Sequence, residues 1–150
     1  MCIAMVAPAF AADRRPSPSR LPVCRDQLLA MPAILLIDDD DAFRETLVVM
    51  LVDRGFTVVQ ASNGLEGVDA WRRRAPDLVI TDMRMPYMDG LKTIRLLQIE
   101  LPDIPVIACS GSLGGALSEA AALGAIALPK PFTPLALFEI IQRALEHTAS

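Results

Sequence analysis

The sequence predicts an α/β protein built on a doubly wound parallel sheet of five strands. From Met31 onward, short apolar runs alternate with amphipathic helical patterns at a regular pace. The runs are continuous and do not alternate apolar with polar residues, which is typical of strands buried on both faces of a parallel sheet. With 150 residues, the chain has the length of one such domain.

Each predicted strand is a short apolar run bounded by polar or turn-forming residues. The five strands are Ile34–Ile37, Phe56–Val59, Leu78–Thr81, Val106–Cys109 and Ile126–Leu128. The predicted helices cover 42–53, 65–74, 90–101, 114–123 and a final segment that begins at Thr133. Thr133 is a good N-cap, and Pro134 follows it at the first helical position. The pattern is (βα)5, a flavodoxin-like sandwich of three layers with helices on both faces of the sheet.

The first thirty residues differ from the rest in composition. They open with an Ala-rich stretch and contain four of the twelve prolines of the chain. Their short apolar stretch weakly imitates a signal peptide, but it has no basic beginning and Pro8 interrupts it. Because Met31 stands directly before the first predicted strand, we interpret residues 1–30 as a disordered or spurious extension and residues 31–150 as the domain.

Charge and cysteine usage exclude several classes of partner. Without its first thirty residues, the chain carries 10 basic and 16 acidic residues, a net charge of −6. This argues against direct contact with nucleic acid, since phosphate contacts need clustered Lys and Arg. No stretch is long and apolar enough to span a membrane. Three cysteines without metal-binding spacing fit a reducing compartment, so we expect a cytoplasmic protein.

Four acidic residues, Asp38 to Asp41, follow the first predicted strand directly. Neighbouring carboxylates repel one another, so we interpret the run as negative charge collected for a cation. Within it, we expect Asp40 to face solvent and Asp41 to favour the N-terminus of the following helix.

Polar side chains stand at the carboxyl ends of four of the five predicted strands. They are Asp38 and Asp39 after the first strand, Asp82 after the third, Ser110 after the fourth and Lys130 after the fifth. A strand-end Asp alone often only caps the next helix. In a doubly wound sheet, however, the carboxyl ends form the site, and five such residues together indicate one.

The residue types favour phosphoryl chemistry with a metal. Three carboxylates suit Mg2+, a hard cation that uses few protein ligands and keeps several waters. With Mg2+ bound, Asp82 becomes a candidate nucleophile toward a phosphoryl group, since carboxylates form aspartyl-phosphate intermediates. Lys130 could then neutralise charge on the phosphoryl oxygens, and the Ser110 hydroxyl could donate to one of them.

Four segments together resemble a known family. Ile37–Asp40, Asp82–Gly90, Val106–Gly111 and Lys130–Phe132 are similar, in this order and with suitable spacing, to the motifs of the response-regulator receiver domain of two-component signalling. The resemblance covers residues 33–147. It implies that Asp82 is the phosphoacceptor and that Asp38 and Asp39 hold Mg2+ with it. It also implies that the backbone carbonyl of Met83 or Arg84 lies beside the metal.

The resemblance assigns roles at the other strand ends too. Ser110 matches the hydroxyl residue that contacts the phosphoryl group, and Lys130 matches the lysine that pairs with it. The Lys130–Pro131 peptide would be cis, and Gly90 would let the loop turn into the third helix. One departure is Ala127, which stands where the family often has an aromatic residue that moves with the hydroxyl residue. A switch that couples to such an aromatic is not supported by this sequence.

The resemblance implies a phosphorylated signalling protein and not a conventional enzyme. A sensor histidine kinase or a phosphotransfer protein would supply the phosphoryl group, the receiver would catalyse only its own phosphorylation and dephosphorylation, and a downstream protein would read the result. Since no output domain follows the last predicted helix, we expect a stand-alone receiver.

Two alternatives stay open. A phosphatase similar to the haloacid dehalogenases also uses a strand-end Asp, and Asp38 and Asp40 match the spacing of its first motif, but Ala42 stands where that motif requires Thr or Val. A pseudo-receiver that never takes phosphate is the other alternative. The complete set of five polar residues argues against it.

Overall fold

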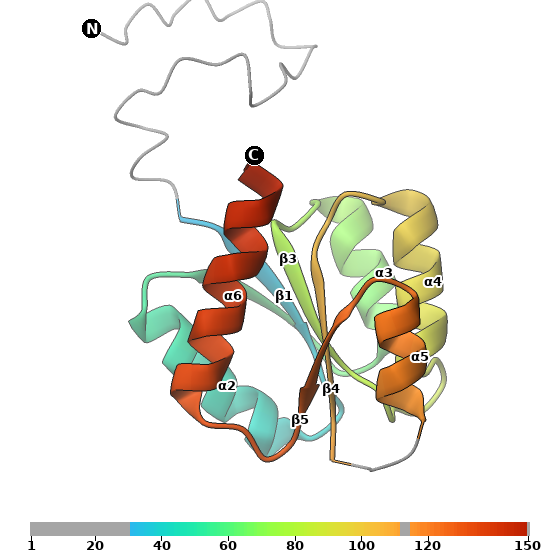
Figure 1. Cartoon of the computed structure of the whole chain (residues 1–150), viewed down its shortest axis with the longest axis horizontal. Helices are drawn as coiled ribbons and strands as arrows, with labels where there is room; N and C mark the ends of the chain where they lie inside the picture. The colour runs from blue at the N-terminus through green and yellow to red at the C-terminus, as the bar shows by residue number, and fades with distance from the viewer. Residues whose placement is uncertain (1–30, 112–114, 150) are drawn as a thin grey trace, which may run out of the picture. The chain divides into compact units, whose positions relative to one another are not determined.

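Five parallel strands form one sheet between two layers of helices (Figure 1). The computed structural model describes residues 31–111 and 115–149. The strands are β1 (Ala33–Ile37), β2 (Thr57–Ala61), β3 (Leu78–Asp82), β4 (Val106–Ser110) and β5 (Ile126–Pro129). They pair in the order β2-β1-β3-β4-β5. The predicted doubly wound (βα)5 fold is thereby confirmed.

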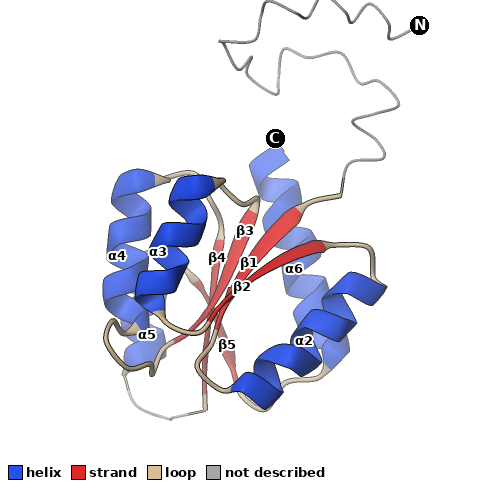
Figure 2. Cartoon of the chain, turned by 180° about the vertical axis from the view of Figure 1, so that it is seen from behind, coloured by secondary structure: helices blue, strands red, loops and turns tan. Residues whose placement is uncertain are grey.

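The helices divide between the two faces of the sheet (Figure 2). They are α2 (Asp41–Asp53), α3 (Gly64–Arg73), α4 (Gly90–Glu100), α5 (Ala116–Ala122) and α6 (Pro134–Ala149). Ile34 and Leu36 of β1 belong to the apolar cluster under α2 and α6, whereas Leu35 and Ile37 belong to the cluster under α3, α4 and α5. Successive residues of a strand point to opposite faces, so the continuous apolar run of β1 fills both layers of the core.

The expectation that all five strands are buried on both faces is wrong for two of them. All residues of β1, β3 and β4 are buried, but three of the five residues of β2 and two of the four residues of β5 are exposed. The reason is the strand order, which places β2 and β5 at the edges of the sheet. An edge strand lacks a neighbour on one side, and its flank is open to solvent.

Short polar side chains begin the helices next to the carboxyl ends of the strands. Asp40, expected only to face solvent, is exposed and is also the N-cap of α2, because its Oδ1 accepts the Phe43 N–H at 3.1 Å. Asp41 lies in the first turn, where it pairs with Arg44 at 2.7 Å. Thr133 caps α6 as predicted, by accepting a backbone N–H at 3.1 Å.

The prediction for residues 1–30, a disordered or spurious extension, lies outside the described residues. Within the part of the chain that the structure describes, no helix combines the length and the apolar character needed to cross a bilayer.

Gly90 begins α4 and lies against the end of β3. A Cβ atom on Gly90 would come within 2.6 Å of the Asp82 carbonyl oxygen and 2.7 Å of the Met83 Cα. The backbone has no room to yield in a packed core. The φ angle of Gly90 is not in the positive region, which among the described glycines is limited to Gly55 and Gly124. Lack of space, and not the conformational freedom inferred from the sequence, therefore explains this glycine.

Gly90→Ala should lower the free energy of unfolding by roughly 1–3 kcal/mol, the usual cost of forcing extra atoms into a packed region. Gly115→Ala is the matched control, because Gly115 has helical backbone angles and no heavy atom lies within 4 Å of an added Cβ. There the change should be neutral or stabilise by up to about 1 kcal/mol. Urea unfolding measures both, and equal losses at the two positions would contradict the steric explanation.

Glu100 ends α4 and joins it to α3. Its carboxylate accepts hydrogen bonds from the Arg72 guanidinium at 2.6 and 3.0 Å and from the Trp71 indole Nε1 at 2.8 Å. The hydrogen bond from Arg72, followed by that from Trp71, lowers the pKa of Glu100 to about 2. The ionised carboxylate is therefore the form that connects the two helices.

The sign of this shift gives a pH dependence. The folded pKa of about 2 lies below the ordinary value of 4.5, so the contribution of Glu100 to stability is complete above pH 4.5 and is lost as the pH falls toward 2. Glu100→Gln should therefore destabilise the protein at about pH 6 and much less at about pH 3. Urea unfolding followed by the fluorescence of Trp71, the only tryptophan, measures this. A loss of stability that is equal at both pH values would contradict the role of the charge.

Candidate functional site

The polar residues predicted at the strand ends meet around one cavity. Asp38 follows β1 directly, Asp82 and Ser110 are the last residues of β3 and β4, and Lys130 follows β5. The cavity has a volume of about 420 Å³ and is lined by Asp38, Asp39, Asp40, Asp82, Arg84, Ser110, Gly111 and Lys130. All five residues singled out in the sequence lie on its wall. The second strand contributes none.

A larger cavity, of about 590 Å³, lies at the opposite end of the sheet. It opens beside Pro105 and Gly124, which precede β4 and β5, and beside the last turns of α6. Its lining is mainly apolar, and its charged side chains, Asp103 and Arg143, are exposed. Size alone therefore does not identify the site, whereas convergent buried polar groups do.

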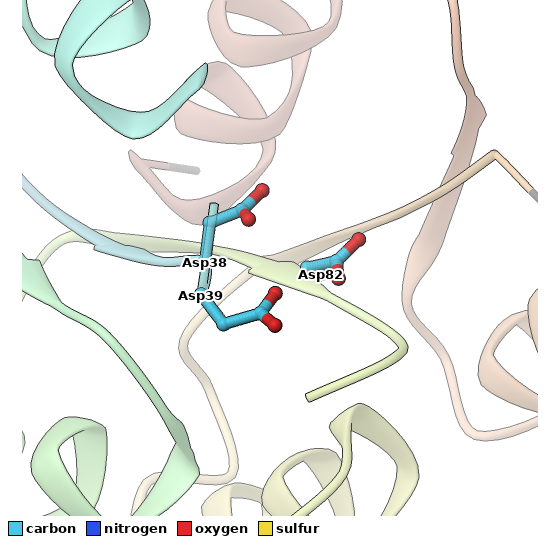
Figure 3. A group of neighbouring side chains, drawn as sticks. All are labelled: Asp38, Asp39 and Asp82. Atoms are coloured by element: carbon cyan, nitrogen blue, oxygen red, sulfur yellow. The ribbon is translucent and has the colours of Figure 1, made fainter. Parts of the chain in front are cut away.

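Three carboxylates of this site lie close together (Figure 3). One carboxylate oxygen from each of Asp38, Asp39 and Asp82 lies within 4.8 Å of the others. Asp38 and Asp82 are buried, with 3% and 8% of their surface exposed, and Asp39 is exposed. Oxygens on opposite sides of one Mg2+ are about 4.2 Å apart, so small side-chain rotations would bring this set onto one ion. The residues present fit a hard divalent cation.

Among the described residues, Lys130 brings a positive charge into this cluster. Its Nζ donates to Asp82 Oδ1 at 3.1 Å and to Asp38 Oδ2 at 3.2 Å. The ammonium group also lies 4.2 Å from the centre of the Phe43 ring, a cation–π contact. The strand-end lysine is thus held between the two buried carboxylates and is not solvated in isolation.

The pKa shifts of Asp82 and Lys130 combine the effects of burial and of neighbouring charge. Burial raises the pKa of Asp82, and the charge of Asp38 raises it further, while Lys130 and a hydrogen bond from the Arg84 backbone oppose the shift. Burial lowers the pKa of Lys130, but the charges of Asp82 and Asp38 outweigh it and leave this pKa raised. Lys130 therefore stays charged, and its charge does not overcome the effect of burial on the pKa of Asp82.

Backbone contacts orient the buried Asp38. Its Oδ1 accepts the Asp40 N–H at 2.9 Å, and its carbonyl oxygen accepts a hydrogen bond from Arg44 Nη1 at 2.6 Å. The sequence gives no sign of the contributions of Arg44 and Phe43, since both look like ordinary residues of the first turn of a helix. Their positions result from the direction in which α2 leaves the acidic run.

Of the two backbone carbonyls considered from sequence, only that of Arg84 belongs to a residue that lines the cavity. Met83 is buried, and its carbonyl oxygen accepts the Gly90 N–H at 3.2 Å. At the fifth strand, the carbonyl oxygen of Ser110 accepts the Lys130 N–H at 2.8 Å, which fixes the lysine beside the serine. The Lys130–Pro131 peptide is cis, as the resemblance implies.

Comparison with known proteins identifies the family. The model of the response regulator receiver domain matches residues 34–142. The chain therefore belongs to the receiver domains of two-component response regulators.

Curated relatives include the transcriptional regulatory protein GlrR of Escherichia coli K12, which is 38% identical over 118 residues, 77% of this chain and 27% of GlrR. The response regulator MprA of Mycobacterium sp. strain KMS is 39% identical over 114 residues, 73% of this chain and 47% of MprA. The chain thus spans between about a quarter and a half of these relatives.

Solved structures agree with the fold. A response regulator receiver domain protein from Clostridium thermocellum superposes with a TM-score of 0.74 at 30% identity, covering 78% of this chain and 96% of the other. The chemotaxis protein CheY4 of Vibrio cholerae superposes with a TM-score of 0.72 at 28% identity, covering 77% of this chain and all of CheY4. The match to nearly complete receiver chains shows that the described domain contains the whole fold.

Asp82→Asn should stabilise the folded protein at neutral pH in the absence of divalent cations. The folded pKa of Asp82 is raised above its ordinary value of 3.8, so its ionisation destabilises the fold as the pH rises through this interval. The gain of the variant should be present at pH 7 and vanish below about pH 4. Asp41→Asn is the control, since it removes an exposed carboxylate paired with Arg44 and should lose at most about 1 kcal/mol.

Thermal unfolding in EDTA across this pH range measures both variants. A melting temperature of Asp82→Asn at or below that of the wild type at pH 7 would contradict the cost of ionising this buried carboxylate.

Proposed function

We propose that Asp82 accepts a phosphoryl group in an Mg2+-dependent reaction and that the receiver signals through the change that follows. The observation that carries this proposal is the cluster of three carboxylates whose oxygens lie within 4.8 Å, with Lys130 bonded to two of them. Such a cluster has excess negative charge, and an incoming phosphoryl group, which is also an anion, would be repelled by it. The site is suited to the reaction only when a divalent cation is added to it.

Asp39, Asp38 and Asp82 are the side chains that would hold Mg2+, with the Arg84 carbonyl as a further oxygen ligand. The ion, when bound, supplies positive charge for the phosphoryl oxygens and for the carboxylates around them. Counting charges supports this assignment, because three carboxylates lie together and Lys130 is bonded to only two of them.

In the proposed reaction, a carboxylate oxygen of Asp82 attacks the phosphorus atom of the donor. A P–O bond forms to Asp82 while the bond from phosphorus to the donor breaks, and the donor leaves with that electron pair. When phosphohistidine is the donor, the histidine that leaves takes a proton from water. When acetyl phosphate is the donor, acetate leaves. The attacking oxygen needs its lone pair, so Asp82 must be ionised.

Lys130 and Ser110 would position the transferred group. Lys130 already lies 3.1 Å from Asp82 Oδ1, so its ammonium group is placed to pair with a phosphoryl oxygen on that atom. Ser110 is buried on the cavity wall at the end of β4, where its hydroxyl could donate to a second oxygen. A new dianionic group would change the contacts of both residues, and a change in the strand ends is how the state would reach the surface.

The proposed partners follow from the family. Receiver domains take phosphoryl groups from histidine kinases or from phosphotransfer proteins, and we propose such a donor here together with a downstream protein that reads the phosphorylated state. Ala127 is exposed in β5 and brings no aromatic ring to this switch. The proposed readout therefore depends on Ser110, Lys130 and the backbone around them.

Phosphorylation by acetyl phosphate with Mg2+ tests the assignment. The wild type should gain an acid-labile phosphoryl group, seen by intact-protein mass spectrometry, and Asp82→Asn should gain none. Asp39→Asn should raise the Mg2+ concentration needed for half-maximal labelling by about tenfold or more, because it removes one of three charged ligands. Asp41→Asn, outside the carboxylate cluster, is the control and should label like the wild type.

Equal labelling of Asp82→Asn would disprove the phosphoacceptor. No labelling of the wild type by acetyl phosphate or by a phosphorylated phosphotransfer protein, together with no Mg2+ binding at millimolar concentration, would favour the pseudo-receiver. Repeated turnover of small phosphate esters would favour the phosphatase.

We further propose that residues 31–150 form the receiver. The family match to residues 34–142 supports this boundary.

A further inference from the structure

The two edges of the sheet differ in their protection against an additional strand. Edge strands are normally blunted by shortness, proline or charge. The edge strand β5 has four residues and contains Pro129, whereas β2 has five residues, Thr57 to Ala61, with neither proline nor a charged side chain. Thr57, Val59 and Gln60 are exposed. The β2 edge therefore lacks the usual features that prevent pairing.

The backbone of β2 offers hydrogen-bonding groups on its outer side. The Thr57 N–H donates to the Pro32 carbonyl, and the Ala61 carbonyl accepts the Asp38 N–H, both at 3.1 Å. The backbone groups of Thr57 and Ala61 therefore point toward β1. Because alternate residues of a parallel strand bond to the same side, Val58 and Gln60 direct their N–H and C=O groups outward. No strand in the described part of the chain pairs with them.

Apolar side chains flank this edge on both layers. Val59 is 40% exposed on the α3 side of the sheet. On the other side, Arg44 of α2 bonds to the Gln60 side chain at 3.1 Å, which identifies the flank of α2 nearest the edge. Val48 and Val52 follow Arg44 at four-residue spacing on the same flank, and Val52 is 53% exposed. An added strand would cover apolar surface on either side of its backbone.

Helix α3 carries an acidic side chain near the carboxyl end of β2 and basic side chains near its amino end. Glu66 accepts hydrogen bonds from Ser62, just beyond the carboxyl end of β2. Arg73 and Arg74 line a small cavity with Thr57 and Val59, near the amino end. Glu66 and Arg73 are seven residues apart and so lie on one flank of the helix. A second β2 edge that runs in the opposite direction would bring each acid toward the partner's base.

We propose that β2 pairs with the β2 of a second copy of this chain, antiparallel and about a two-fold axis at Val59. Each Val58 N–H would donate to the carbonyl of the partner's Gln60, and each Gln60 N–H to the carbonyl of the partner's Val58. The two Val59 side chains would meet at the axis, and Glu66 would lie near the partner's Arg73. The two sheets would join into one.

The charge pattern is what selects a second copy as the occupant. A two-fold contact uses the same surface on both partners, so it requires a surface that is complementary to itself. An edge with an acid at one end and a base at the other meets this condition only in antiparallel pairing. A uniformly acidic or basic peptide would be attracted at one end and repelled at the other.

Sedimentation equilibrium of the full chain tests the pairing. The wild type should show a reversible equilibrium between one and two copies of the 16.2 kDa chain. Gln60→Pro removes an outward N–H that β1 does not use, and it should weaken the dimer by at least about tenfold. Gln60→Ala also loses the bond to Arg44 but keeps the N–H, so its dissociation constant should stay within about twofold of the wild type.

A charge exchange tests the same geometry without altering the strand. Arg73→Glu and Glu66→Arg should each weaken self-association, because each places like charges opposite one another. An equimolar mixture of the two variants should recover a heterodimer, in which an acid again faces a base at both contacts. This second test also decides the outcome if Gln60→Pro does not fold.

Three results would overturn the proposal. They are a chain that remains monomeric up to millimolar concentration, a dimer whose affinity is unchanged by Gln60→Pro, and single charge variants whose mixture associates no better than either alone. If β2 binds another protein or peptide in place of a second copy, the chain alone would stay monomeric, which is the first of these results.

Discussion

The repulsion among three neighbouring carboxylates is the constraint on which this structure depends. Asp38, Asp39 and Asp82 hold oxygens within 4.8 Å of one another, and Lys130 alone among the described cations lies between two of them. Free side chains would separate under this repulsion. They stay together because β1 and β3 are adjacent, fully buried strands whose carboxyl ends reach the same edge of the sheet. The packed core thus maintains an arrangement of charge that is unfavourable on its own.

Groups around the site offset part of the negative charge of these carboxylates. Backbone N–H groups and the caps of helices contribute partial positive charge, as in the bond from the Asp40 N–H to Asp38. Gly90 lets α4 begin directly against β3, which keeps the segment after Asp82 short and close. Burial nevertheless raises the pKa of Asp82. A site that holds three carboxylates around one lysine, with two of them buried, is suited to a divalent cation.

The strand order separates this chemistry from the open edge of the sheet. The acids belong to β1 and β3 at the centre, whereas β2 lies outside β1 and contributes no residue to the site. The edge is therefore available for contacts that do not compete with phosphoryl chemistry. Among the described side chains, Arg44 touches both regions, since it bonds to the Asp38 carbonyl and to Gln60. The two surfaces share a residue without sharing a cavity.

The sequence alone determined the strands, most helix limits and the residues that meet at the site, because apolar runs and the polar residues that end them are local signals. Only the tertiary structure decided which strands are edges, and hence why β2 is exposed despite its apolar composition. It also decided that Phe43 lies beneath Lys130, that Glu100 bonds to Trp71, and that Gly90 is required for space. The contacts of Phe43 and Glu100 join segments far apart in the chain, and the local pattern at one end of such a contact contains no information about the other.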